Sequence, residues 1–181
     1  INGISSVFSA TVGSVSLWAK TSVTSSSGNY FKTYVDGTNN ISILYHAADD
    51  ELKINYKGGG GSITAVSTEE IEGDGLWHHI AATWDVAGDE LKLYLDGVLQ
   101  QTTTSLPTFS GTPGTSSIGN NANEGGYFSG NIDEVSLFNV ELTAANVTTL
   151  YNDGLPYTVE GDTGLIGWWR MGDGTLTGDA I

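Results

Sequence analysis

The chain has 181 residues, which suits a single domain and allows a substantial core to be buried. Six basic residues stand against 21 acidic ones, a formal net charge of −15 at pH 7. This charge argues against nucleic-acid binding and against adhesion to anionic membranes, because phosphates and anionic lipids are bound by Lys and Arg. No window approaches the ~20 apolar residues of a membrane-spanning helix, so we do not expect membrane insertion. The absence of cysteine excludes disulfides. Because the chain opens at Ile1 without Met or a signal peptide, we expect it to be processed or excerpted from something longer.

Short strands separated by turns are expected over the first part of the chain. Apolar and polar residues alternate there at the period of two that a strand requires. The predicted strands span residues 15–20, 30–35, 41–45, 52–56 and 63–68. The same period places Tyr30 and Tyr34 on one strand face. The four glycines at 58–61 lie between two strands and predict a hairpin tip.

The central stretch, residues 75–101, predicts a three-stranded antiparallel meander. Its first strand carries an apolar stripe on alternate residues, namely Leu76, Ile80, Ala82, Trp84 and Val86. Leu91, Leu93 and Leu95 form a second stripe, and the pair at 96–97, Asp-Gly, supplies the left-handed backbone of a two-residue hairpin turn. The class is therefore all-β.

The last third predicts a polar connection over 102–114, strands over 116–119 and 128–138, and one short helix near 143–152. Thr143 is the expected N-cap, Leu142 and Val147 are spaced as a hydrophobic staple, and Gly154 stands where a C-terminal glycine belongs. Val147, Leu150 and Tyr151 are expected to face the sandwich.

Two motifs carry a family resemblance. A Trp-x-His-hydrophobic-Ala strand begins at Trp77 and is followed at 92–97 by Lys-Leu-Tyr-Leu-Asp-Gly. The second motif, Gly-Asn-Ile-Asp-Glu-Val-Ser-Leu-Phe-Asn-Val, begins at Gly130. In this order they resemble the laminin-G-like module of the concanavalin A-like lectin/glucanase superfamily. The resemblance implies a two-sheet antiparallel jelly-roll β-sandwich with the one short helix.

The tail, residues 164–172, resembles the strand that usually opens such a module, although here it comes last. It either closes its own sandwich within a single domain spanning 1–181 or inserts into a neighbouring subunit by strand addition. Self-closure is favoured, because a sandwich that lacks an edge strand exposes unpaired backbone.

No catalytic residue is assigned. The chain lacks the Glu-x-Asp-x-x-Glu set of the related β-glucanases, whose carboxylates act as acid and nucleophile. The acidic cluster at 69–74 is interpreted as a solvated turn. His79 is interpreted as a hydrogen-bonded histidine of the core or the sheet surface.

A metal site is the second candidate. Strand parity places Asp133 with Val135 and Leu137, and a carboxylate on an apolar face needs hydrogen-bond donors or a cation. Proteins that the sequence resembles often hold a structural calcium with the closing-strand Asp and groups from the opening strand, which implies Asp133 and Asp173 as ligands here. The alternative is an Asp that accepts backbone N–H bonds at the start of a strand.

A sugar site is the third candidate. Asn120, Asn121, Asn123 and Tyr127 lie in one loop and combine amides with an aromatic ring, as lectin sites do. The same residue types are also ordinary turn chemistry.

These observations give three functional hypotheses. The leading one is a non-catalytic recognition or adhesion module that binds glycans or cell-surface partners, is stabilised by calcium, and acts outside the cell or on a virion surface. The alternative is a structural or decoration protein of a phage virion or surface filament, which would self-associate or dock on the particle. The third is an accessory domain of a glycan-active enzyme. The fold alone does not decide among them.

Overall fold

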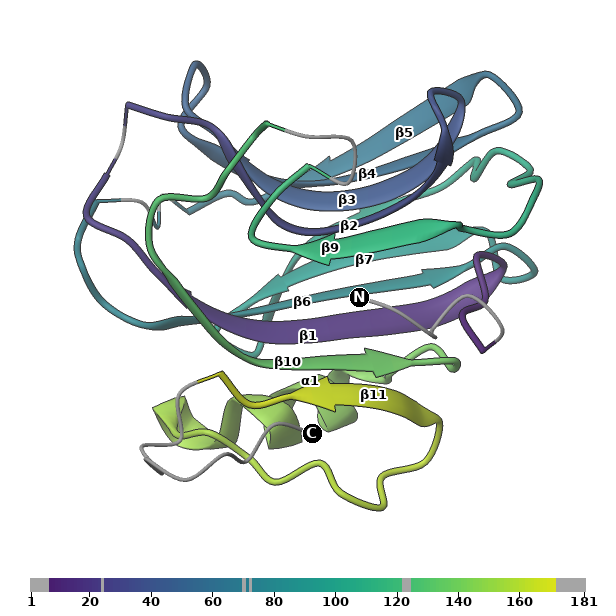
Figure 1. Cartoon of the computed structure of the whole chain (residues 1–181). Coiled ribbons are helices and arrows are strands. Elements are labelled where there is room, and N and C mark those ends of the chain that lie inside the picture. The colour runs from purple at the N-terminus through teal and green to yellow at the C-terminus, as the bar shows by residue number, and fades with distance from the viewer. Residues whose placement is uncertain (1–6, 24, 70, 72, 122–124, 172–181) are drawn as a thin grey trace.

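The structure is a computed structural model that describes residues 7–23, 25–69, 71, 73–121 and 125–171. Two antiparallel sheets of six and five strands lie face to face (Figure 1). The all-β jelly-roll sandwich predicted from the sequence is confirmed. The six-stranded sheet has the order β11-β10-β1-β6-β7-β8, with β1 (Val12–Lys20), β6 (His78–Asp85), β7 (Glu90–Leu95), β8 (Val98–Thr103), β10 (Asn131–Phe138) and β11 (Leu165–Trp169). The five-stranded sheet has the order β5-β4-β3-β2-β9, with β2 (Gly28–Asp36), β3 (Asn39–His46), β4 (Glu51–Gly58), β5 (Gly61–Val66) and β9 (Thr115–Ile118).

The main core fills the space between the two sheets. Trp84, Leu91 and Leu93 are fully buried there, as the stripes of the central meander predicted. Ile41 and Ile54 meet them from the five-stranded sheet. Each such side chain contributes roughly 1.5–3 kcal/mol through burial, so this layer determines how the sheets stack.

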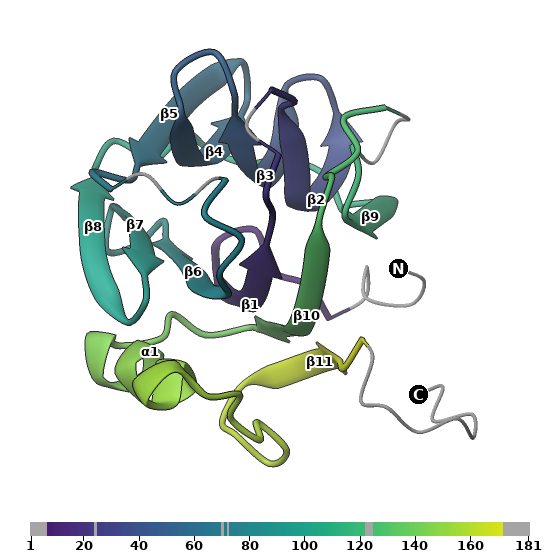
Figure 2. The same ribbon diagram turned by 90° about the vertical axis from the view of Figure 1, so that its left-hand side faces the viewer.

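A second apolar layer lies on the outer face of the six-stranded sheet, where the helix α1 (Ala144–Tyr151) covers it (Figure 2). Thr143 is the N-cap and forms a capping box with Asn146. Leu142 and Val147 belong to the same buried cluster, so the predicted staple is present. Asn152, rather than Gly154, takes the left-handed C-cap position and leads into the short 3-10 turn η2 (Asn152–Gly154).

The first strand of the meander starts later than its apolar pattern predicted. β6 begins at His78, and Leu76 is 61% exposed. The cause is local, because the Asp74 carboxylate accepts the backbone N–H of Leu76 and holds residues 74–76 in a turn. The stripe therefore begins at Ile80.

Two β-bulges reverse the strand parity that the sequence suggested. In β10, Ser136 lies opposite Ser16 while Asp133 lies opposite Trp18, so β10 holds one extra residue, and Glu134 has a φ of +49°. The bulge turns Asp133 to the helix side of the sheet, whereas Val135 and Leu137 face the core between the sheets. The prediction that Asp133 shares their face is wrong for this reason.

A bulge at Tyr30 has the same effect in β2. Tyr30 is buried in the main core, whereas Tyr34 is half-buried outside it, so these two tyrosines do not share a face.

The tail strand β11 pairs antiparallel with β10 of the same chain. Trp169 packs against the main core and Trp168 against the layer under the helix, so both fill internal space. None of the helices in the described part of the chain has the length and apolar character needed to cross a membrane.

Candidate functional site

The loop predicted to bind sugar is closed largely by its own backbone. The N–H of Asn121 donates to the Gly125 carbonyl at 2.9 Å, and the Asn120 carbonyl accepts from the Ser117 hydroxyl at 2.9 Å. Tyr127 is 64% exposed and projects from the loop. Asn123 lies outside the described residues. The structure thus brings Asn120, Asn121 and Tyr127 into one loop beside the start of β2, and their role in sugar binding stays a prediction.

Asp133 lies in the wall of a small pocket of about 160 Å³ with Trp18, Trp77 and Glu134. Its Oδ1 accepts the backbone N–H groups of Glu134 and Met171, both at 2.8 Å. These contacts match the alternative to a calcium ligand given above, namely an Asp that accepts backbone N–H bonds.

The neighbouring Glu134 has partners of its own. Its carboxylate accepts the Trp168 indole N–H at 2.6 Å and lies 3.7 Å from the Arg170 guanidinium. Among the described residues no group of three or more His, Cys, Asp and Glu side chains could hold a metal ion. The described residues do not by themselves form a calcium cage, since calcium takes six to eight oxygens. Asp173, the other predicted ligand, lies outside them, so calcium stays a prediction.

His79 is a structural histidine, as the sequence indicated. It is buried, and its Nε2 lies 2.8 Å from the Ser16 hydroxyl. Burial lowers the pKa of His79 to about 4, so its ring is neutral at physiological pH. Ser16 is also buried, and the rings of Trp18 and Tyr151 lie against His79 from the helix side. This Ser-His pair is enclosed and presents no nucleophile to a substrate.

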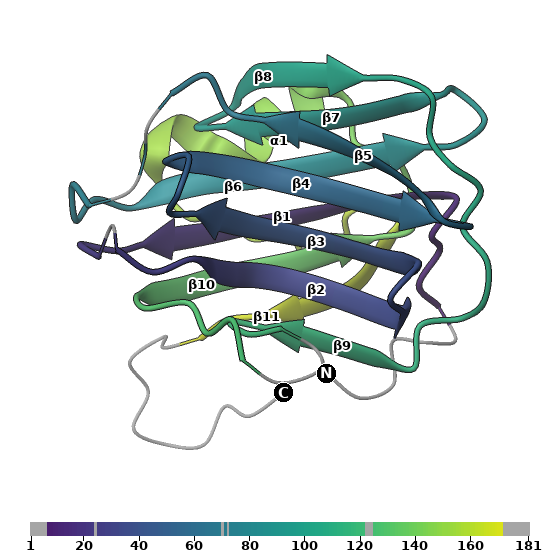
Figure 3. The same cartoon turned by 90° about the horizontal axis from the view of Figure 1, so that it is seen from above.

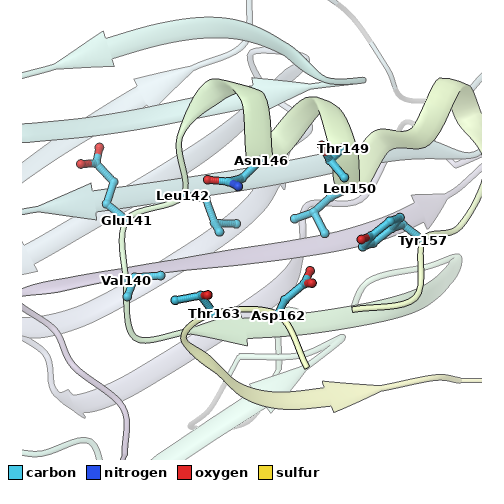
Figure 4. A pocket seen from close by; sticks show the side chains of 9 residues that line it. All are labelled: Val140, Glu141, Leu142, Asn146, Thr149, Leu150, Tyr157, Asp162 and Thr163. Atoms are coloured by element: carbon cyan, nitrogen blue, oxygen red, sulfur yellow. The ribbon is translucent and has the colours of Figure 1, made fainter. Parts of the chain in front are cut away.

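A pocket of about 420 Å³ lies between α1 and the connection that leads into β11 (Figure 4). Its lining residues are Val140, Glu141, Leu142, Asn146, Thr149, Leu150, Tyr157, Asp162 and Thr163. Several of its polar side chains already have hydrogen-bond partners within the chain. Glu141 accepts from Lys92 at 2.9 Å, Asn146 completes the capping box, and Thr149 donates to the Ala145 carbonyl. We therefore interpret this pocket as a gap in the packing between the helix and the connection into β11, and not as a ligand site.

The outer face of the five-stranded sheet offers a larger polar surface. The strands of this sheet bend away from the six-stranded sheet at both ends, so the outer face is concave (Figure 1). The helix and β11 lie on the opposite side of the molecule, and Figure 3 looks onto the outer face.

Strand register places two rows of polar side chains across this face. The first row consists of Thr115, Tyr34, Asn40, Lys57 and Ser62. The second consists of Ser117, Lys32, Ser42, Asn55 and Thr64. Tyr34, Lys32, Asn55, Lys57 and Thr64 are all partly exposed. The Thr64 hydroxyl donates to the Asn55 side chain at 2.7 Å, which fixes the orientation of that amide.

No sequence motif marks this face as a site. The polar residues alternate correctly along each predicted strand, which indicates an outward face. Their convergence depends on the order of the strands, which alternation does not reveal.

Comparisons with known proteins agree with the architecture. The laminin G family model described as the concanavalin A-like lectin/glucanases superfamily matches residues 4–148. Domain 4 of AbnA, an extracellular arabinanase from Geobacillus stearothermophilus solved with arabinotriose, is 26% identical with a TM-score of 0.67, over 78% of this chain and 66% of that one. The CBM40 domain of the Ruminococcus gnavus IT-sialidase, solved with sialyllactose, is 13% identical with a TM-score of 0.64, over 77% of this chain and 82% of that one.

A curated relative matches a shorter stretch. The "Sushi, von Willebrand factor type A, EGF and pentraxin domain-containing protein 1" of Rattus norvegicus is 31% identical over 86 residues, 42% of this chain. The chain spans only 2% of the length of that relative. Because the family model covers most of the chain and the sandwich has the matching architecture, this protein belongs to the concanavalin A-like lectin/glucanases superfamily.

Proposed function

We propose that the chain is a non-catalytic glycan-binding module and that the outer face of the five-stranded sheet is its binding surface. The observation that carries the proposal is the pair of polar rows across a concave, partly exposed sheet. A sugar presents hydroxyl groups that both donate and accept hydrogen bonds, together with apolar C–H faces. Asn55 and Thr64 offer hydrogen-bonding groups, and the ring of Tyr34 offers an aromatic surface for stacking.

The same rows support binding rather than turnover. Most glycoside hydrolases use two carboxylates placed about the scissile bond. None of the residues in the two described rows is acidic. The enclosed Ser16–His79 pair, in turn, is out of reach of a substrate.

The similar proteins suggest what kind of larger protein could contain this module. Domain 4 of AbnA is part of a larger extracellular arabinanase and was solved with a trisaccharide. This likeness favours an extracellular role and, as a second proposal, an accessory domain of a longer glycan-active enzyme. Sequencing the parent reading frame tests that setting, since a catalytic domain in the same frame supports it and a run of virion modules contradicts it. The virion or filament role and the calcium site stay separate predictions.

The experiment for glycan binding is a broad glycan array followed by calorimetry on the best ligand. Tyr34→Ala should weaken binding about tenfold, because an aromatic contact is worth ~0.5–1.5 kcal/mol beyond its buried area. Tyr127→Ala is the matched control, as it removes an exposed tyrosine of the loop.

The two variants show whether the sheet face or the loop is the binding site. If Tyr127→Ala abolishes binding while Tyr34→Ala has no effect, the loop is the site and the sheet face is not. A wild-type chain that binds nothing on the array contradicts the proposed function as a whole.

A further inference from the structure

The six basic residues of this acidic protein differ in whether a carboxylate of the chain neutralises their charge. Three of the six contact a carboxylate: Lys53 pairs with Asp49 and Glu51, Lys92 with Glu90 and Glu141, and Arg170 with Glu134. Lys20, on the six-stranded sheet, lies over the Trp77 ring. The remaining two, Lys32 and Lys57, lie on the five-stranded sheet. Among the described residues, no carboxylate lies within ion-pairing distance of either ammonium group.

These two lysines lie close together on the outer face of the five-stranded sheet. Lys32 is on β2 and Lys57 on β4, with only β3 between them, which separates their strands by about 10 Å. They belong to adjacent rows, so their side chains project from the same face. Burial and the positive charge of Lys57 lower the pKa of Lys32, which indicates that the two charges interact. The Lys32 ammonium also lies 5.6 Å from the centroid of the Tyr34 ring.

Two neighbouring like charges that no described carboxylate neutralises favour an anionic partner. Their mutual repulsion and partial desolvation are relieved when an anion binds between them. The net charge of −15 does not prevent this. At physiological ionic strength the screening length is about 8 Å, so the local pair dominates over distant carboxylates.

We propose that Lys32 and Lys57 bind an acidic sugar residue, one that carries a carboxylate or a sulfate group, on the concave sheet face. This inference rests on the proposed glycan-binding function and adds the chemical class of the ligand. The acid group lies between the two ammonium groups, while Asn55 and Thr64 of the same rows contact the sugar hydroxyls. A single pair of lysines suits one acid group on a sugar chain, whereas binding to nucleic acid requires many phosphate contacts.

The experiment compares acidic and neutral ligands on matched variants. Calorimetry is run with oligogalacturonate as the carboxylated probe, a heparin oligosaccharide as the sulfated probe, and arabinotriose as the neutral probe. The variants are Lys32→Met, Lys57→Met and the double variant. Lys53→Met is the control, because Lys53 lies on the same face but is already paired with Asp49 and Glu51. Thermal melts verify that each variant is folded.

Each of the two substitutions should weaken binding of the acidic probe about tenfold, because each removes one charged hydrogen-bond donor to the acid group. Lys53→Met should change the affinity for the acidic probe by less than about twofold. The probe that loses affinity identifies the acid group as carboxylate or sulfate. If neutral and acidic probes bind equally to the wild type and the double variant, the acidic-sugar inference is wrong while glycan binding stands. If the wild type binds none of these probes nor any array glycan, both are wrong.

Discussion

His78 joins three segments at one end of the six-stranded sheet and gives the stability of this protein a defined pH dependence. Its Nδ1 lies 2.8 Å from the Asp96 carboxylate and its Nε2 lies 3.0 Å from that of Asp74. These contacts tie the start of β6 to the β7–β8 turn and to the turn that precedes β6. The perturbation is His78→Gln, which puts a hydrogen-bonding amide in place of the imidazole and removes the titrating charge.

The magnitude follows from the pKa of His78. The hydrogen bond to Asp96, supported by Asp74, raises that pKa from 6.5 to about 9 against the opposing effect of burial. A difference of this size corresponds to at most ~3.4 kcal/mol, at 1.36 kcal/mol per pKa unit. The side chains of Asp96 and Asp74 are 33% and 42% exposed, so solvent screens both pairs. We therefore expect ~1–2 kcal/mol.

The sign is set by linkage. Because the folded-state pKa of His78 lies above its unfolded value, the stabilisation is fully present below pH 6.5 and is lost as the pH rises through about 9. The free energy of unfolding is measured by urea denaturation between pH 6 and pH 10. The wild type should exceed His78→Gln by ~1–2 kcal/mol at pH 6, and the difference should shrink towards pH 10.

The control is His46→Gln, which breaks an exposed pair whose side chains are 40% and 49% accessible. We expect it to change the free energy of unfolding by less than ~0.5 kcal/mol. A His78→Gln deficit that stays constant across this pH range would refute the linkage reasoning.

Three further predictions concern the core, the helix and the metal. Trp84→Ala should lower the free energy of unfolding by ~3–5 kcal/mol, because it opens a cavity in the layer between the sheets; a loss under ~1 kcal/mol would show that this layer is not packed as described. Thr143→Ala should cost about 1 kcal/mol through loss of the capping box, whereas Thr149→Ala on the exposed side of the same helix should cost less than half as much; equal losses would argue against the cap. If calcium binds at Asp133, EDTA should lower the melting temperature of the wild type but not of Asp133→Ala; a wild-type melt that EDTA leaves unchanged would contradict calcium binding.

The strands and the helix were predictable because their signals are local. The leucines of residues 91–95 alternate at the period of a strand. Such an apolar stripe has to be buried, and here it packs against the apolar face of the other sheet. The capping box and staple around Thr143 lie within a few residues of one another, so they could be recognised before any tertiary contact was known.

Face assignments failed where a bulge intervened. Asp133 and Tyr30 were each placed by counting alternate residues, and one extra residue in the strand reverses that count. The placement of Leu76 in the strand was wrong for a related reason. Asp74 forms a local turn with Leu76, so the strand starts later than the apolar pattern. In each case a contact outside the period of the strand decided the outcome.

The sequence by itself determined the class of the fold, the position of its strands and helix, and its family, because periodicity and short motifs depend on neighbours along the chain. Only the tertiary structure decided which side chains share a surface. Lys32 and Lys57 are 25 positions apart along the chain and become neighbours because β3 pairs with both β2 and β4. The register of these two successive hairpins, which includes bulges in β2, set the face on which they lie, and alternation along the chain does not specify that register.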